Sequence, residues 1–150
     1  ALSARVYEFS QFLVKVLGVE DVGAAYSGRV TYHDSCHLLR KLGIREEPRR
    51  LIQAVKGVEL VEMEHSEACC GFGGAFSVKL PHISEAILRE KIENIQASGA
   101  EAVVANDTGC LMHIAGALSR RRLPVRAIHL AELLNYSSNP LSLPSENLVE

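Results

Sequence analysis

The feature that most constrains the fold is a regular alternation of short apolar stretches with longer amphipathic ones. Four stretches have the length and composition of strands, at residues 29–33, 58–61, 102–105 and 124–128. Helical periodicity or helix-start signals are found before, between and after them, at residues 3–18, 36–43, 48–57, 81–99, 109–122 and 129–134. This order predicts an α/β fold with three layers, a mostly parallel sheet with helices on both faces, of the Rossmann-like or flavodoxin-like kind.

The bulk properties predict one domain. A chain of 150 residues is long enough to bury a core without disulfides. We assign residues 1–136 to this domain and residues 137–150, rich in Ser, Pro and Asn, to a flexible C-terminal tail. The net charge of −2 and the absence of Trp give no nucleic-acid footprint. No apolar run is long enough for a membrane span, so neither nucleic acid nor a direct membrane span is expected.

The chain has four cysteines, and each follows a predicted strand: Cys36, Cys69, Cys70 and Cys110. The carboxyl ends of parallel strands meet at one edge of the sheet, where open α/β folds bind ligands. We therefore expect the four sulfur atoms to lie in one crevice. Clustered cysteines in a chain of this size are typical of a reducing, cytoplasmic compartment, where they serve metal or redox chemistry.

The vicinal pair Cys69-Cys70 is followed by Gly71-Phe72-Gly73-Gly74, and a relaxed disulfide between adjacent cysteines is disfavoured by geometry. The glycines allow a sharp bend and a close approach of backbone N–H groups to sulfur. Cys36 and Cys110 lie in the first turns of predicted helices, where the helix dipole favours a thiolate.

Three chemistries fit these thiols: an iron–sulfur cluster, a tetrahedral zinc site, or thiol–disulfide exchange with Cys69 or Cys70 as nucleophile. The absence of a Cys-x-x-Cys knuckle disfavours plain zinc. The expected metal ligands are Cys36, Cys69, Cys70 and Cys110, with His113, three residues after Cys110 on the same helix face, as a further candidate. The glycines expected at the cofactor are Gly71, Gly73, Gly74 and Gly109. His33, at the end of a strand near the crevice, is interpreted as an ordinary polar terminus.

Three segments resemble the CCG cysteine-rich domain family: Ser35-Cys36-His37, Cys69 to Gly74, and Asp107 to Met112. The likeness covers nearly all of residues 5–135. This domain occurs in heterodisulfide reductases, in iron–sulfur subunits of glycolate and glycerol-3-phosphate oxidation, and in lactate utilisation proteins. The family pattern ends in Cys-x-x-Cys, whereas the last position here is His113.

The resemblance implies an iron–sulfur electron-transfer component, acting as an oxidoreductase subunit in the oxidation of L-lactate or another 2-hydroxy acid such as glycolate. Such proteins carry two CCG domains in tandem, and this chain resembles the second. The implied partners are the N-terminal CCG half of the same protein and the other subunits of a lactate or glycolate oxidation complex. A zinc-stabilised interaction module and a thiol–disulfide redox domain are the alternatives, and no catalytic residue is assigned.

Overall fold

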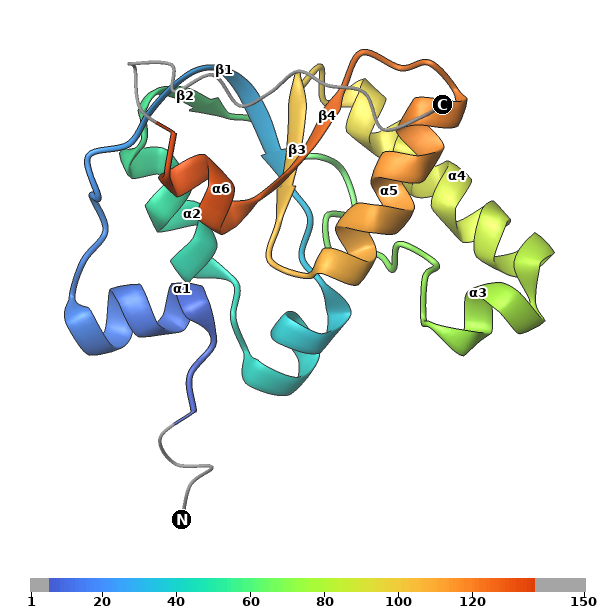
Figure 1. Cartoon of the computed structure of the whole chain (residues 1–150), viewed down its shortest axis with the longest axis horizontal. Coiled ribbons are helices and arrows are strands. Elements are labelled where there is room, and N and C mark those ends of the chain that lie inside the picture. Colours follow the sequence, from blue (N-terminus) through green and yellow to red (C-terminus); the bar gives the residue numbers. More distant parts are fainter. Residues whose placement is uncertain (1–5, 137–150) are drawn as a thin grey trace, which may run out of the picture.

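A computed structural model describes residues 6–136, which form one four-stranded sheet between two layers of helices (Figure 1). The strand order is β2-β1-β3-β4, and every neighbouring pair is parallel. This confirms the predicted three-layer α/β fold. The elements in chain order are α1 (Phe9–Gln11), η2 (Phe12–Leu17), β1 (Ala25–Tyr32), η3 (Leu38–Leu42), α2 (Glu46–Ala54), β2 (Lys56–Leu60), α3 (Ala75–Lys79), α4 (Pro81–Ala97), β3 (Ala102–Ala105), α5 (Thr108–Arg120), β4 (Arg126–His129) and α6 (Leu130–Leu134).

Several element boundaries differ from those predicted. The first helix begins at Phe9, where the Glu8 carboxylate caps it by accepting hydrogen bonds from the Ser10 and Gln11 backbone N–H groups, and the predicted start at residue 3 lies outside the described residues. Strand β1 begins at Ala25, four residues before the predicted start. Helix α3, directly after Gly74, was not predicted at all. The predicted tail at residues 137–150 lies outside the described residues.

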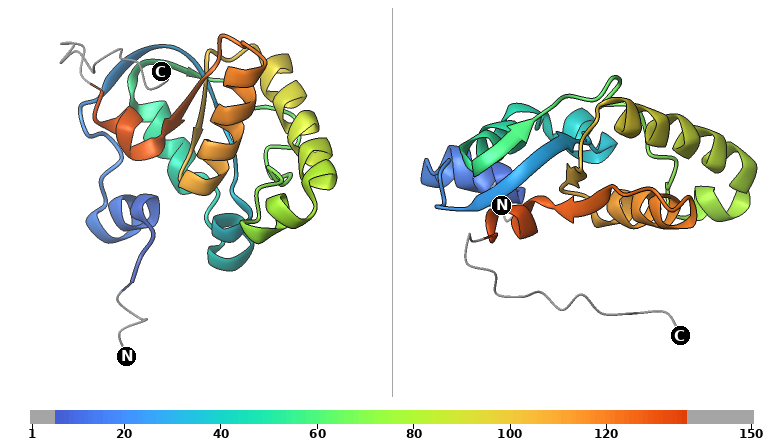
Figure 2. Two further views of the ribbon diagram at one scale, coloured as in Figure 1. Left: turned by 45° about the vertical axis from the view of Figure 1, so that its right-hand side comes forward. Right: turned by 90° about the horizontal axis from the view of Figure 1, so that it is seen from above.

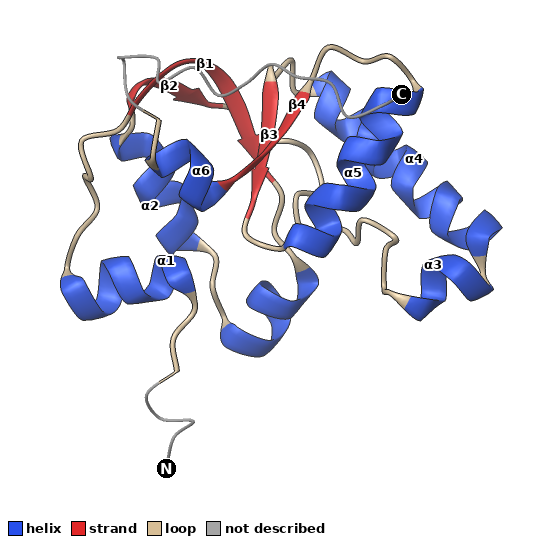
Figure 3. Cartoon of the chain, viewed as in Figure 1, coloured by secondary structure: helices blue, strands red, loops and turns tan. Residues whose placement is uncertain are grey.

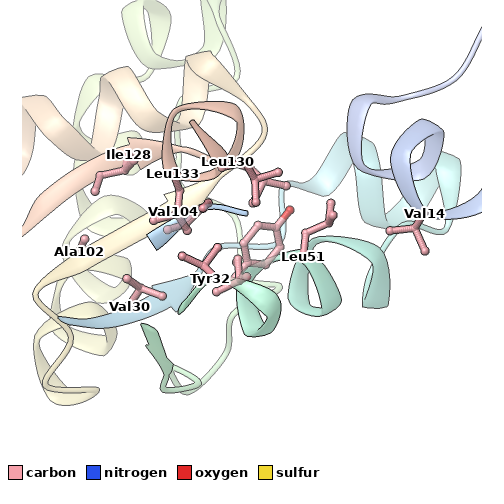
Figure 4. Close-up of a cluster of buried hydrophobic side chains, with 13 residues drawn as sticks. Val14, Val30, Tyr32, Leu51, Ala102, Val104, Ile128, Leu130 and Leu133 are labelled. Carbon is pink, nitrogen blue, oxygen red and sulfur yellow. The ribbon is translucent and has the colours of Figure 1, made fainter. Parts of the chain in front are cut away.

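Alternate residues of the strands face two different cores, one on each side of the sheet. We call the first the aliphatic core. It is covered mainly by α2 and α6 and includes Val30, Tyr32, Leu51, Ile52, Val104, Ile128, Leu130 and Leu133 (Figure 4). We call the second the cysteine core. It is covered by α4 and α5 and comprises Met63, Cys70, Leu88, Ile92, Ile95, Val103, Cys110, Ile114, Ala117 and Leu118.

The carboxyl ends of β1 and β3 lie side by side at the centre of the sheet, where the chain order reverses. Figure 3 shows the segment after β1, the loop before α3 and the start of α5 gathered at this one edge, and Figure 2 shows the same grouping from two other directions. Such a reversal point is where open α/β sheets form ligand sites. Within residues 6–136, none of the helices has the length and apolar character that crossing a bilayer requires.

Candidate metal centre

Two of the four cysteines are in contact at this edge of the sheet. The Sγ atoms of Cys70 and Cys110 lie 3.1 Å apart, although the two residues are 40 positions apart in the chain. Cys70 is 2% exposed and Cys110 is 6% exposed. Cys36 is half-buried just after β1, and Cys69 is exposed. The prediction that cysteines after parallel strands meet at one edge of the sheet is therefore confirmed for Cys70 and Cys110.

His33 completes a buried group of donor atoms with these two cysteines. It directly follows β1, is fully buried, and has a ring nitrogen that lies with the Sγ atoms of Cys70 and Cys110 within 4.8 Å of one another. Among the described residues, neither ring nitrogen of His33 has a hydrogen-bond partner. The sequence contained a signal for this: Thr31, His33 and Ser35 alternate along one face of the strand and its extension.

The hydroxyl groups of Thr31 and Ser35 are also buried and, within residues 6–136, also lack a hydrogen-bond partner. A buried polar group without a partner costs roughly 1–3 kcal/mol, so three in succession on one strand are unusual in a folded protein. His33, the middle one of the three, lies with the contacting sulfur atoms, which indicates that a polar or charged group belongs at this edge of the sheet.

The donor set suits a metal centre. Donor atoms around one tetrahedral zinc lie roughly 3.5–3.8 Å apart, from bond lengths of about 2.0–2.3 Å. The observed separations of up to 4.8 Å are close to that spacing. Thiolates with imidazole are ligands for zinc and for iron–sulfur clusters. Cys70, Cys110 and His33 would hold the metal from the buried side, and Cys36 and Cys69 are the further thiols at the same edge.

The contact between the two thiols shifts their pKa values in opposite directions. The hydrogen bond with Cys110, and to a smaller extent the His33 ring, lowers the pKa of Cys70 to about 4 against the opposing effect of burial. The hydrogen bond with Cys70 and burial both raise the pKa of Cys110. A lowered pKa favours the thiolate form of Cys70, and the thiolate is the form of cysteine that binds a metal. Our expectation of a thiolate at Cys110 stays a prediction.

The glycine turn shapes the loop as expected. The Gly71 backbone N–H donates a hydrogen bond to Cys69 Sγ at 3.3 Å. Gly71 has a φ of +87°, and a Cβ there would lie 2.6 Å from the Ser84 carbonyl oxygen, so no other residue fits without movement. Burial, together with the charges of Cys70 and Cys36, raises the pKa of Cys69, which the Gly71 N–H lowers in part.

The loop that carries the pair is anchored by a buried ion pair. Arg49 of α2 donates two hydrogen bonds to the two Asp34 carboxylate oxygens, at 2.9 and 2.8 Å. Ser66 Oγ donates to the same carboxylate at 2.8 Å, and Arg49 also donates to Glu62 at 2.7 and 3.0 Å. Residues 62–66 are thereby held against the end of β1, which sets the position of the cysteine loop.

His113 contacts Ser84 and lines a cavity. Its Nε2 is 3.3 Å from the Ser84 hydroxyl, and its ring lines a cavity of about 340 Å³ between α3, α4 and α5. Burial lowers the pKa of His113, the charge of Cys70 raises it, and Arg120 lowers it. His113 is not part of the group formed by His33, Cys70 and Cys110, so its role as a ligand stays a prediction from sequence.

The other predicted glycines have structural roles. Gly73 and Gly74 have positive φ values of 53° and 57° and lie in the turn before α3. At Gly109, a Cβ would lie 2.9 Å from the Phe72 ring, so this glycine lets α5 approach the cysteine loop closely. Asp107 caps α5 by accepting a hydrogen bond from the Cys110 backbone N–H at 3.0 Å. Contact of these glycines with a cofactor stays a prediction.

The fold and the site define a cysteine-rich α/β domain with its thiols at the reversal point of a parallel sheet. A family model described as the cysteine-rich domain CCG matches residues 30–115, more than half of the chain. The chain therefore belongs to the CCG cysteine-rich domain family, as its sequence motifs predicted.

Several curated relatives are named lactate utilization protein A. The one from Geobacillus thermodenitrificans is 53% identical over 90% of this chain and 56% of its own length. The protein from Bacillus subtilis is 48% identical over 89% of this chain and 56% of its own length. The protein from Lysinibacillus sphaericus is 45% identical over 90% of this chain and 59% of its own length. The chain thus spans little more than half the length of these relatives.

Proposed function

We propose that this domain binds an iron–sulfur cluster and carries electrons in the oxidation of L-lactate, or of another 2-hydroxy acid such as glycolate. The observation that carries the proposal is the buried contact of Cys70 and Cys110 beside His33, whose ring has no partner among the described residues. When bound, an iron–sulfur cluster accepts and releases single electrons. The names of the relatives support the assignment to lactate utilisation.

The residues of this chain would supply thiolates and exclude water. Cys36, Cys69, Cys70 and Cys110 would be the sulfur ligands, and His33 stands where a further ligand can bind. The buried side of the site keeps water from the metal, and the anchored loop fixes the vicinal pair. Backbone donors such as the Gly71 N–H stabilise negative charge on sulfur, a contact that tunes cluster potentials.

We further propose that the chain is the second of two CCG domains in a cytoplasmic protein and works with its N-terminal half and with partner subunits. The greater length of the relatives supports this arrangement. The hydroxy acid would be oxidised in a partner subunit or at an interface with one. Mixing the full-length protein with its partner subunits and L-lactate should reduce the cluster, whereas omitting the partner subunits should leave it oxidised.

Anaerobic purification, followed by reconstitution with iron and sulfide, tests the cluster. We expect stoichiometric iron and sulfide, visible absorbance that bleaches on reduction, and an electron paramagnetic resonance signal. The variants Cys70→Ser and Cys110→Ser should lose the signal, whereas the exposed His82→Ala serves as the matched control and should keep it. Stoichiometric zinc without iron, even after anaerobic reconstitution, would overturn the proposal.

A thiol–disulfide function is the second candidate, favoured by the 3.1 Å separation of Cys70 and Cys110 and by the low pKa of Cys70. Forming the Cys70–Cys110 bond would pass two electrons to a disulfide acceptor, whose S–S bond breaks to give two thiols that take up the Cys110 proton and one proton from solvent. Mass spectrometry of alkylated, metal-free protein would show rapid labelling of Cys70 and turnover with a small disulfide in this case. Turnover that needs no metal would favour this function over the cluster.

A further inference from the structure

Helix α4 carries a lysine into the interior next to the cysteine centre. Lys91 is 1% exposed, and its helix neighbours Leu88 and Ile92 both belong to the cysteine core. Lysine is almost never fully buried unless its charge is compensated, because desolvating an ammonium group costs several kcal/mol. The surroundings of the Lys91 Nζ atom should therefore show what compensates it.

Three acceptors surround the Lys91 ammonium group. Nζ donates to the backbone carbonyl of His65 at 2.7 Å and to that of Ser66 at 3.2 Å, and it lies 3.9 Å from Met63 Sδ. Three acceptors match the three N–H donors of the charged form, whereas a neutral amine would turn a lone pair toward one of them. The arrangement indicates that Lys91 is a buried cation.

The two carbonyl groups do not need the lysine. The His65 carbonyl already accepts from the Ala68 backbone N–H at 3.0 Å, and the Ser66 carbonyl accepts from the Asp34 backbone N–H at 3.1 Å. Among the residues that the structure describes, no carboxylate lies within ion-pair distance of Lys91. Two neutral carbonyl groups and one thioether are the hydrogen-bond partners of Lys91 Nζ among those residues.

Buried sulfur groups that can carry a negative charge lie in the core that Lys91 contacts. Met63, whose Sδ lies 3.9 Å from Lys91 Nζ, belongs to the cysteine core together with Cys70 and Cys110. Burial lowers the pKa of Lys91, while the charges of Glu67, Cys70, Asp34 and Cys69 oppose that effect. Unlike the exposed Glu67, the sulfur atoms at Cys70 lie in the same water-free interior.

We propose that Lys91 is the counter-charge of the cysteine centre, a positioning residue that makes a buried, electron-rich sulfur site stable inside this fold. The inference rests on the proposed function, because the anion that Lys91 offsets is the thiolate-bound metal group. A nearby cation stabilises the more negative, reduced form of such a group and strengthens its binding. Lys91 therefore raises both the reduction potential and the metal affinity of the centre.

Two substitutions separate charge from hydrogen bonding. Lys91→Gln keeps a polar donor and removes the charge, and Lys91→Arg keeps the charge with a larger head group. The matched control is Lys79→Gln, because Lys79 is an exposed lysine on α3. If Lys91→Gln does not fold, Lys91→Met takes its place in the test. Methionine has no hydrogen-bond donor, but the His65 and Ser66 carbonyl groups each still accept one bond from a backbone N–H group. Melting of the metal-free proteins establishes which variants are folded.

The reduction potential of the reconstituted full chain is the first measurement. At the wild-type midpoint potential, the ratio of reduced to oxidised cluster should fall at least roughly tenfold in Lys91→Gln, a shift of about 59 mV for a one-electron couple. Lys91→Arg and Lys79→Gln should stay at the wild-type value. An unchanged potential in Lys91→Gln, or an equal shift in Lys91→Arg, would overturn the proposal.

Measuring the zinc affinity tests the role of Lys91 without an iron–sulfur cluster. If the wild type forms no iron–sulfur cluster, the proposed function fails, but competition with a chromogenic chelator still measures how the thiols hold zinc. Lys91→Gln should then bind zinc at least roughly tenfold more weakly than Lys79→Gln, about 1.4 kcal/mol. Equal zinc affinities in these two variants would show that Lys91 has no electrostatic role at this site.

Discussion

The two faces of the sheet are stabilised by different means. The aliphatic core contains Leu, Ile, Val and Ala with the ring of Tyr32, and these side chains fill the space under α2 and α6 (Figure 4). The cysteine core borders unpaired hydroxyl groups, an unpaired histidine and a buried lysine, all within residues 6–136. The described side chains of the first face are apolar apart from the Tyr32 hydroxyl, whereas the second face borders the His33 ring nitrogens, which have no hydrogen-bond partner among the described residues.

Strand β1 produces this difference by alternation. Val30 and Tyr32 point to the aliphatic core, and Thr31 lies between them on the other face, with His33 continuing the same side. One strand therefore contributes to stability on one face and to a site on the other. The following predictions test how separate the two roles are, from the largest expected effect to the smallest.

The largest effect is expected at Arg49, which links α2 on the aliphatic side to the cysteine loop. Arg49→Met leaves the buried Asp34 carboxylate without its cation, which costs roughly 3–5 kcal/mol. Urea denaturation of the metal-free protein at pH 7 measures the loss. The exposed Arg40→Met is the control and should differ from the wild type by less than about 0.5 kcal/mol.

Acidification provides a second check on this pair. Burial alone raises the pKa of Asp34, but the hydrogen bonds and charge of Arg49 outweigh burial and hold that pKa below its usual value. The stability that the Asp34–Arg49 pair contributes is therefore present above about pH 4, and it is lost as the pH falls through the folded-state pKa of Asp34. The stability difference between the wild type and Arg49→Met should narrow on acidification. A constant difference would contradict the ion-pair account.

Within the aliphatic core, Leu51→Ala should cost roughly 2–5 kcal/mol, because Leu51 is fully buried and its removal leaves a cavity. The loss should appear in the metal-free protein and should be the same with metal bound, if the two faces act separately. Leu42, which is 52% exposed, provides the control substitution Leu42→Ala. A large change in metal affinity in Leu51→Ala would show that the two faces are coupled.

Metal binding should stabilise the protein only through the cysteine face. At a free metal concentration of about 100 times Kd, the unfolding free energy should rise by about 2.7 kcal/mol, provided the unfolded chain does not bind. Thermal melting with zinc, or anaerobically with the cluster, measures this gain, and a chelator should remove it. Cys70→Ser should show no gain. A full gain in Cys70→Ser would place the metal elsewhere.

The smallest effect is expected in the glycine turn. Gly71→Ala forces an unfavourable backbone conformation and a contact with the Ser84 carbonyl, at a cost of roughly 1–3 kcal/mol, and it should also weaken metal binding. Gly18→Ala, at a similar positive φ of 67° but with open space around it, should cost about 1 kcal/mol and leave metal binding unchanged. Equal metal affinities in both variants would refute a role for the turn in positioning the vicinal pair.

Most of the fold could be predicted from periodicity. The stretch at residues 102–105 is short, apolar and bounded by Gly99 and Asp107, and it forms β3 with the predicted bounds. The convergence of Cys70 and Cys110 followed from the rule for strand ends in parallel sheets. Helix α3 was missed because five residues after two glycines carry little helical periodicity. The early start of β1 was missed because Ser27 and Gly28 are not typical of strands.

The site was harder to predict than the fold. Cys110 and His113 are three residues apart, which places them on neighbouring positions of one helix face. Three residues correspond to about 300° of rotation, so the two side chains still differ in direction by about 60°, and His113 contacts Ser84. His33 was underrated because a histidine at a strand end is usually exposed, and its full burial depends on tertiary packing that the local sequence does not show. Lys91 is indistinguishable in sequence from a surface lysine of an amphipathic helix.

Cys69 is the exposed member of the vicinal pair, while Cys70 and Cys110 lie inside the protein. If the domain carries electrons as proposed, this asymmetry sets the direction of transfer. The body of the domain would insulate the buried sulfur atoms, and tunnelling to an external acceptor would be fastest across the surface around Cys69. A redox partner would then have to approach from that side, which would restrict the orientation of a second domain or subunit.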